Sequence, residues 1–254
     1  MCTYIILPNT SDGPVIGYAT DDAVEWLEST IDSEPTPLPQ YPENGIYALG
    51  AGSGEFDYEL ESQEIFPRPQ LDQPESLFAI EQFMKKYAHF SGQPNQSGFM
   101  DLRSLKTLAG EWSVGDSDVW YPGDDGITFN TYGGCQSPKL RRYCDPNHPH
   151  CMYYDKRMSR MSQIVEDHRD RLGVDVAWKM LLDRTPGGEV CQHIDTRPPG
   201  ISFVTLRNYV LAPALGRYWV RTVAEGKAPD EVDPVEMRFD PWPCGTGKQG
   251  NING

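Results

Sequence analysis

The start of the chain constrains its fold more than any other segment. Residues 3–9, TYIILPN, are apolar, aromatic and β-branched, which favours a buried strand. Residues 11–14, SDGP, are a turn signal, and residues 15–20, VIGYAT, favour a second strand. The two segments predict a hairpin that returns Asp21 to the side of Cys2. We therefore expect an antiparallel sheet whose first strand begins at Cys2.

Later segments predict further strands and helices. Strands are expected at residues 45–50 and 127–132, and a second hairpin at residues 203–211 and 217–222. Helices are expected at residues 75–89, 155–172 and 175–182, and a flexible loop at residues 91–98. Because strands come first, then helices, then strands, the order favours an α+β fold over a parallel doubly wound sheet.

Length and composition limit the class of protein. The 254 residues suffice for a sizeable core. We expect one domain over residues 1–244 and a flexible, glycine-rich tail over residues 245–254. The net charge of −15 argues against nucleic acid as a partner. No run of about 18 apolar residues is present, so no membrane-spanning segment is expected.

The cysteine count and the first residues bear on the compartment. Six cysteines in a chain of this length do not make a disulfide scaffold. No signal peptide is expected before Cys2, because neither a basic segment nor an apolar segment precedes it. A reducing, cytoplasmic location is therefore the simpler expectation. Association into homo-oligomers is left open.

Cys2 is a candidate nucleophile. Methionine aminopeptidases act when the second residue is small, and cysteine is small enough for removal of Met1. Cys2 then carries a thiol, with a reference pKa of about 8.5, and an α-amine, with one of about 7.7–8.0. At neutral pH the free amine can take the thiol proton, so the nucleophile carries its own base. A longer precursor cut before Cys2 gives the same end, and the alternative is a cysteine without function.

A second group of residues offers a different chemistry. The segment CDPNHPHC contains Cys144, His148, His150 and Cys151, which are ligand types that zinc accepts in tetrahedral sites. Its spacing is not that of a standard zinc finger, and its two prolines restrict how the ligands converge. A disulfide between Cys144 and Cys151 and a plain surface loop remain alternatives, and no metal is assigned.

The start of the chain resembles that of the N-terminal-nucleophile (Ntn) cysteine hydrolases. In these enzymes a Cys-Thr pair opens a strand, a turn with glycine follows, and a second strand ends at an aspartate. Cys2-Thr3, Asp12-Gly13 and the strand ending at Asp21 match this order. The relevant branches are the choloylglycine hydrolases, the acyl-coenzyme A:6-aminopenicillanate acyltransferases and the cysteine-dependent dipeptidases.

Later segments resemble the acyltransferase branch best. Residues 129–131, FNT, are similar to the strand with the oxyanion-hole asparagine. Residues 158–160, MSR, are similar to the helix start with the active-site arginine. Residues 190–193, VCQH, and the closing hairpin are similar to later parts of that branch. The resemblance covers about two thirds of the chain in pieces, and the order of the pieces is more specific than any one of them.

The resemblance implies a fold and an activity. The fold is a four-layer αββα sandwich of antiparallel sheets. The activity is cleavage of an amide bond in a small molecule, or transfer of its acyl group, through a thioester on Cys2 and without a cofactor. Asp21 orients the α-amine, Asn130 donates to the oxyanion, and Arg160 braces the carboxylate and the nucleophile.

The chain also departs from the Ntn pattern. Tyr18-Ala19 stands where the pattern has Arg-Asn before the aspartate, and the segment around Glu43-Asn44-Gly45 matches the usual Asn-Glu motif only weakly. The departures favour an alternative, a binding module that keeps the fold without catalysis. A zinc-stabilised binding domain is the third hypothesis.

Overall fold

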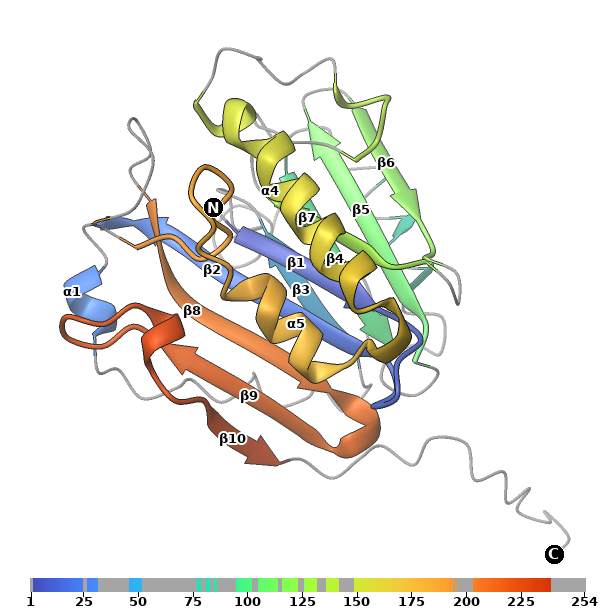
Figure 1. Ribbon diagram of the computed structural model, residues 1–254. Coiled ribbons are helices and arrows are strands. Elements are labelled where there is room, and N and C mark those ends of the chain that lie inside the picture. The colour runs from blue at the N-terminus through green and yellow to red at the C-terminus, as the bar shows by residue number, and fades with distance from the viewer. Residues whose placement is uncertain are drawn as a thin grey trace, which may run out of the picture.

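The structure is a computed structural model (Figure 1). It describes residues 2–24, 27–31, 46–51, 77–78, 81–82, 85, 95–101, 105–113, 116–122, 126–131, 136–141, 149–193, 195 and 203–238.

The larger sheet has six strands in the order β10-β9-β8-β2-β1-β7, and all neighbours in it are antiparallel. Its strands are β1 (Cys2–Leu7), β2 (Val15–Ala23), β7 (Thr128–Thr131), β8 (Phe203–Ala212), β9 (Arg217–Thr222) and β10 (Val235–Arg238). Both predicted hairpins are confirmed: β1 pairs with β2, and β8 pairs with β9. The first hairpin therefore lies inside the sheet, with β7 on one side and β8 on the other.

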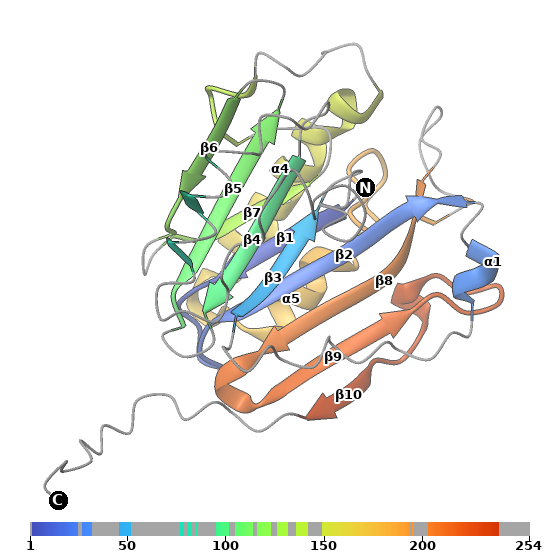
Figure 2. The ribbon, with the colours of Figure 1, turned by 180° about the vertical axis from the view of Figure 1, so that it is seen from behind.

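The smaller sheet has four antiparallel strands in the order β3-β4-β5-β6. They are β3 (Ile46–Ala51), β4 (Asn95–Asp101), β5 (Thr107–Ser113) and β6 (Asp116–Trp120). Figure 2, seen from behind, shows this sheet in front of β1 and β2. The predicted strand at residues 45–50 thus corresponds to β3.

Two helices cover the other face of the larger sheet (Figure 1). They are α4 (Pro149–Asp167) and α5 (Val174–Leu181), with a short 3₁₀ turn, η4 (Arg169–Arg171), between them. A short helix, α1 (Leu27–Thr30), follows β2, and the 3₁₀ turns η5 (Pro213–Leu215) and η6 (Pro229–Glu231) lie near β9. The main core lies between the helices and the sheet, where Met161 and Met180 pack with Ile5 and Val210, all fully buried.

The two sheets pack face to face through side chains that alternate along each strand. Tyr4 and Ile6 of β1 pack against Ala109 of β5, so the even-numbered residues of β1 face the smaller sheet. Gly98 of β4 lies against the same two side chains. A Cβ at residue 98 would come within 3.0 Å of Ile6 Cδ1 and 3.1 Å of Tyr4 Cδ2, so glycine permits this close approach.

The outer face of the smaller sheet is also covered. Leu108 and Trp112 are buried, although their neighbour Ala109 faces the other sheet and alternation therefore places them outside. Helical residues lie on this side: Tyr121, directly after β6, donates a hydrogen bond to Glu81 Oε2 at 2.8 Å. Helix, sheet, sheet and further helical residues make the α+β fold of antiparallel sheets that the αββα expectation describes.

The structure corrects two element boundaries. The loop predicted at residues 91–98 is wrong from Asn95 onward, because Asn95–Asp101 is strand β4. The polar residues of this segment favour a loop in the sequence, but in the structure Gln96 is buried. Gly98 allows the close approach of β4 to Ile6 and Tyr4 of β1. Helix α4 begins at Pro149, before the predicted start at residue 155, and proline suits the first helical turn. None of the described helices is both long and apolar enough to cross a membrane.

Candidate active site

The candidate site lies at the start of β1, next to the segment that follows α5 (Figure 1). The strand register places Cys2 opposite Thr20 and Thr3 opposite Ala19. Asp21 comes next on β2, at the register position beyond Cys2. The register of β2 against β8 shifts between Thr20 and Asp21, so that Asp21 pairs with Thr205. Bulges of this kind often re-aim side chains next to active sites.

Asp21 is buried among polar groups. Its Oδ1 accepts a hydrogen bond from Thr205 Oγ1 at 2.6 Å, and Thr205 Oγ1 accepts one from the Gln192 backbone N–H at 2.8 Å. Burial raises the pKa of Asp21 to about 6, against the lowering effects of the positive amino terminus, the Thr205 hydrogen bond and Arg157. A carboxyl with this pKa is ionised at neutral pH and is held where a cation stabilises it.

Arg157 supplies one such cation. It lies on the sheet-facing side of α4 and is 1% exposed. Its Nη1 donates to Thr131 Oγ1 at 3.4 Å, and Thr3 Oγ1 donates to the same oxygen at 3.0 Å. Burial lowers the pKa of Arg157, and the nearby carboxylates of Asp21 and Glu189 raise it. A buried guanidinium next to two carboxylates is the arrangement in which each charge offsets the burial cost of the others.

Arg160, the arginine selected from the sequence, lies elsewhere. Its Nε donates to Asp183 Oδ1 at 2.9 Å and its Nη1 to Gln163 Oε1 at 3.0 Å, on the partly exposed side of α4. The buried arginine that sequence reasoning missed is Arg157, one helical turn earlier. A signal was present: Arg157 precedes the core residue Met161 by four positions and so shares its face.

Asn130 lies on β7 opposite Tyr4 and is fully buried between the sheets. Its Oδ1 accepts the Thr131 backbone N–H at 2.8 Å, and its Nδ2 donates to Glu111 Oε1 across the sheet interface. Glu111 also accepts backbone N–H groups from Gln136 and Ser137 at 2.8 and 2.9 Å. One of the two Nδ2 hydrogens of Asn130 therefore holds Glu111, which leaves the other for a ligand.

Several buried polar atoms near these residues have no hydrogen-bond partner within the described part of the chain. They include the Tyr4 hydroxyl, Nη2 of Arg157, and both the oxygen and the nitrogen of the Gln192 side-chain amide. Buried polar groups are normally satisfied, by protein or by water. Tyr4 faces the smaller sheet, whereas the backbone of Gln192 is hydrogen-bonded to Thr205, the partner of Asp21.

Cys191 is not a second nucleophile. Its side chain is fully buried, and its Sγ lies 3.8 Å from Asp230 Oδ1. Burial, with Asp230 adding to it, raises the pKa of the thiol to about 12, so the thiol stays protonated at neutral pH. His193 lies 3.6 Å from an Asp195 carboxylate oxygen rather than against this sulfur.

The zinc hypothesis concerns residues that the structure does not describe. Cys144 and His148 lie outside the described residues, as do the side chains of His150 and Cys151. Among the residues that are described, no group of three or more His, Cys, Asp or Glu side chains could hold a metal ion.

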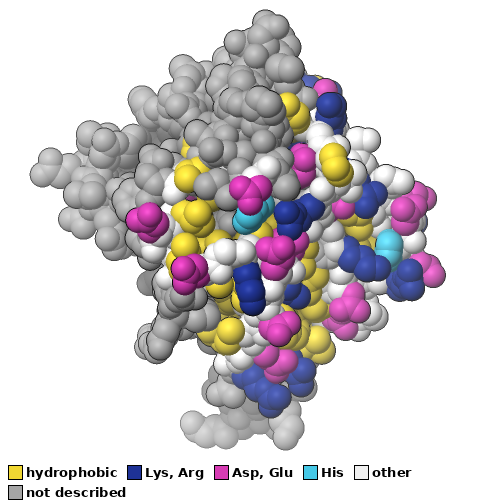
Figure 3. All heavy atoms as spheres, turned by 60° about the vertical axis from the view of Figure 1, so that its left-hand side comes forward, with side chains coloured by type: hydrophobic (Ala, Val, Ile, Leu, Met, Phe, Trp, Pro, Cys, Tyr) yellow, Lys and Arg dark blue, Asp and Glu magenta, His cyan; other side chains and the backbone are white. Residues whose placement is uncertain are grey.

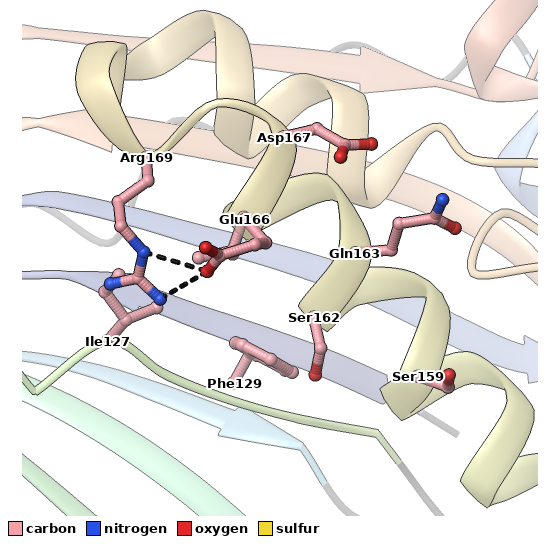
Figure 4. A pocket seen from close by; sticks show the side chains of 9 residues that line it. Ile127, Phe129, Ser159, Ser162, Gln163, Glu166, Asp167 and Arg169 are labelled. Atoms are coloured by element: carbon pink, nitrogen blue, oxygen red, sulfur yellow. Dashed lines mark hydrogen bonds and ion pairs between the residues drawn. The ribbon is translucent and has the colours of Figure 1, made fainter.

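Two hollows on the surface lie away from the buried polar group. A shallow groove of about 630 Å³ runs between α4 and β7, where Ile127 and Phe129 form the floor and the Glu166–Arg169 ion pair crosses one end (Figure 4). A second groove lies between α4 and α5 and includes Arg160 and Asp183. On the part of the face in Figure 3 that belongs to described residues, acidic and basic side chains are interspersed, so these residues make no field of one sign there.

Comparisons with known proteins find likeness in structure alone. No family model matches the chain, and no curated protein is similar to it in sequence. A mutant of conjugated bile acid hydrolase from Clostridium perfringens has 9% identity over 94% of this chain and 97% of that chain, with a TM-score of 0.43. A variant of the same hydrolase has 9% identity over 94% and 89%, with a TM-score of 0.35.

Proposed function

We propose that this protein is an N-terminal-nucleophile enzyme that cleaves an amide bond through Cys2. The observation that carries the proposal is the buried carboxyl of Asp21, one register step beyond Cys2. Once Met1 is removed, the nitrogen of Cys2 becomes an α-amine beside this carboxyl. The carboxylate then accepts hydrogen bonds from the amine, which fixes the amine next to the thiol of the same residue.

The reaction follows from these groups. The α-amine takes the proton from the thiol, and the sulfur attacks the amide carbon to form a tetrahedral oxyanion. The free Nδ2 hydrogen of Asn130 donates to that oxyanion, an interaction worth about 10²–10³ in kcat in comparable sites. The C–N bond breaks, the protonated α-amine gives its proton to the leaving amine, and a thioester remains on Cys2.

The thioester can be resolved in two ways. Water attacks its carbon, the S–C bond breaks, and the acid product leaves with the thiol restored. Alternatively a second amine attacks in place of water and takes the acyl group. Hydrolysis and acyl transfer therefore share every residue up to the thioester, and the accessibility of water at that stage separates them.

The test is turnover of small amides by matched cysteine variants. We expect the wild-type protein to release amine from members of a panel of N-acyl amino acids and simple N-acyl amides. Cys2→Ala removes the nucleophile and abolishes this release, whereas Cys191→Ala, at a buried and protonated thiol, keeps it. An active Cys2→Ala protein would overturn the proposal.

A binding module without catalysis is the second candidate function. It is favoured by Tyr18, which occupies the position of an arginine in the Ntn pattern and stacks on Tyr209 with ring centroids 6.1 Å apart. In this case the buried charges around Asp21 serve the fold alone. Wild-type protein that releases no amine from any member of the panel, together with an alkylation rate at Cys2 typical of an ordinary exposed thiol, would favour this candidate.

A further inference from the structure

The face of the larger sheet that meets the smaller sheet changes from apolar to polar toward Cys2. Residues directly opposite in antiparallel strands are neighbours on one face, so the strand pairings define rows across β1, β2, β8 and β9. One row is Ile6, Ile16, Leu211 and Tyr218, and the next is Tyr4, Tyr18, Tyr209 and Val220. The row after these is Cys2, Thr20, Arg207 and Thr222. An apolar row, an aromatic row and a polar row thus lead to the nucleophile.

Arg207 places a positive charge in the row of Cys2. It is half-buried, and only Thr20 stands between Arg207 and Cys2 in the register. Two strand spacings of about 4.8 Å separate the backbones of Cys2 and Arg207 by about 10 Å. The side chain of Arg207 donates a hydrogen bond to Tyr209, the next residue along β8 on the same face. This contact sets the guanidinium against the aromatic row.

Arg207 and Arg157 lie on opposite faces of the larger sheet. Arg157 reaches the larger sheet from α4, on the opposite face, where it contacts Thr131 and lies near Asp21. Arg207 lies on the face of Tyr18 and Tyr209, both half-buried. One arginine therefore accompanies the buried carboxyl, and the other lies in the register row of Cys2, on the face that meets the smaller sheet.

We propose that Arg207 binds an anionic group, a carboxylate, on the substrate whose amide bond Cys2 attacks. The inference rests on the proposed function and names the class of substrate. A guanidinium binds a carboxylate through two parallel hydrogen bonds, and five N–H donors allow it to keep the Tyr209 contact meanwhile. The chain carries a net charge of −15, which repels anions, so a local cation is needed for an anionic substrate to approach.

The test compares two alkylating reagents that differ in charge. Iodoacetate and iodoacetamide both react as the Cys2 sulfur displaces iodide, with a new S–C bond replacing the C–I bond, but only iodoacetate is anionic. The rate of each reaction is followed at Cys2 by mass spectrometry of the N-terminal peptide. We expect Arg207→Gln to lower the ratio of the iodoacetate rate to the iodoacetamide rate about fivefold, with the iodoacetamide rate unchanged.

The matched control is Arg238→Gln, because Arg238 is exposed on β10 and its loss changes the net charge equally. We expect this variant to keep the wild-type ratio and Arg207→Lys to lie between the two. The salt dependence of the iodoacetate rate gives a check on the wild-type protein alone. Added salt lowers this rate if attraction by Arg207 outweighs repulsion by the net negative charge, and raises it if the repulsion is stronger.

The outcomes separate the two proposals. An unchanged ratio in Arg207→Gln, or a wild-type iodoacetate rate that rises with salt, overturns the role of Arg207 and leaves the proposed function intact. A Cys2 that reacts with neither reagent near pH 7 overturns the proposed function and this inference with it.

Discussion

The ionised carboxyl of Asp21 lowers the stability of the folded protein, although the proposed reaction needs it. Asp21 is 2% exposed, so its ionised carboxyl has lost most of its contact with water. The positive amino terminus, Thr205 and Arg157 recover part of that cost, but the pKa still rises from 3.8 to about 6. The carboxylate is therefore held in the folded protein at a net cost above pH 6, which is understandable if its partner is the α-amine of Cys2.

Replacement of Asp21 by asparagine should reveal this cost. The folded-state pKa lies above the unfolded one, so the folded protein binds the proton more strongly, and the stability contributed by this group falls as pH rises from about 4 to about 6. Asp21→Asn removes the ionisation, and we expect its free energy of unfolding to exceed that of the wild type by about 2–3 kcal/mol at pH 7.5.

Urea unfolding of both proteins at pH 4.5, 6 and 7.5 measures the effect. The difference should grow with pH, and the variant should lose amide cleavage while it gains stability. A gain that is the same at all three pH values would contradict the pKa of Asp21. Cys191→Ala, measured in parallel, controls for a substitution of another buried residue that carries no charge.

The sequence predicts the position of a residue well where a local hairpin determines it. It does not predict a side-chain contact between two residues that are brought together only by the packing of separate sheets. The predicted hairpin brings Asp21 next to the register of Cys2. The partners of Asn130 could not be predicted, because Glu111 belongs to the other sheet and approaches only through sheet packing. The roles given to Cys2, Asp21, Asn130 and Arg160 stay predictions.

At the scale of elements, helix α4 decides which arginine is buried. Its buried residues recur at three- and four-residue spacing, as in Tyr154, Arg157, Met161 and Ile164. Arg160 falls off this stripe and pairs with Asp183 instead. The resemblance to the Ntn pattern selects Arg160 by a local tripeptide, whereas the helical period of α4 selects Arg157.

The two arginines make a matched pair of variants. Arg157→Lys keeps a charge but loses the planar guanidinium near Asp21, so we expect amide cleavage to fall about tenfold or more. A lysine side chain is shorter, so its charge lies farther from Asp21 and lowers the pKa of Asp21 less; the acid limb of the pH–rate profile should therefore move to higher pH. Arg160→Lys, three residues away on the exposed side, should leave both rate and profile unchanged.

A pH–rate profile distinguishes this role from a purely structural one, because general loss of folded protein lowers the rate without moving the limb. Profiles that shift in Arg160→Lys and not in Arg157→Lys would contradict the role given to Arg157.

Strand β4 shows where prediction from local sequence fails. Residues 95–98 have the composition of a polar loop, and they form a strand because β4 pairs with β3 and β5.

At the scale of the molecule, the order of strands and helices was enough to predict the fold class. Antiparallel hairpins at both ends of the chain meet in one sheet, because β2 pairs with β8. That pairing joins segments far apart in sequence, and local propensity cannot predict it. It also creates the bulge beside Asp21 and the row that aligns Cys2 with Arg207.

The central claim is that Cys2, as the first residue, forms a thioester. Intact-protein mass spectrometry after brief incubation with p-nitrophenyl acetate and an acid quench tests it directly, since acid keeps the α-amine protonated and the thioester in place. The account predicts a protein without Met1 that carries one acetyl group, located on Cys2 by peptide mapping and absent in Cys2→Ala. A protein that retains Met1, or an acetyl group found equally in wild type and Cys2→Ala, would contradict the account.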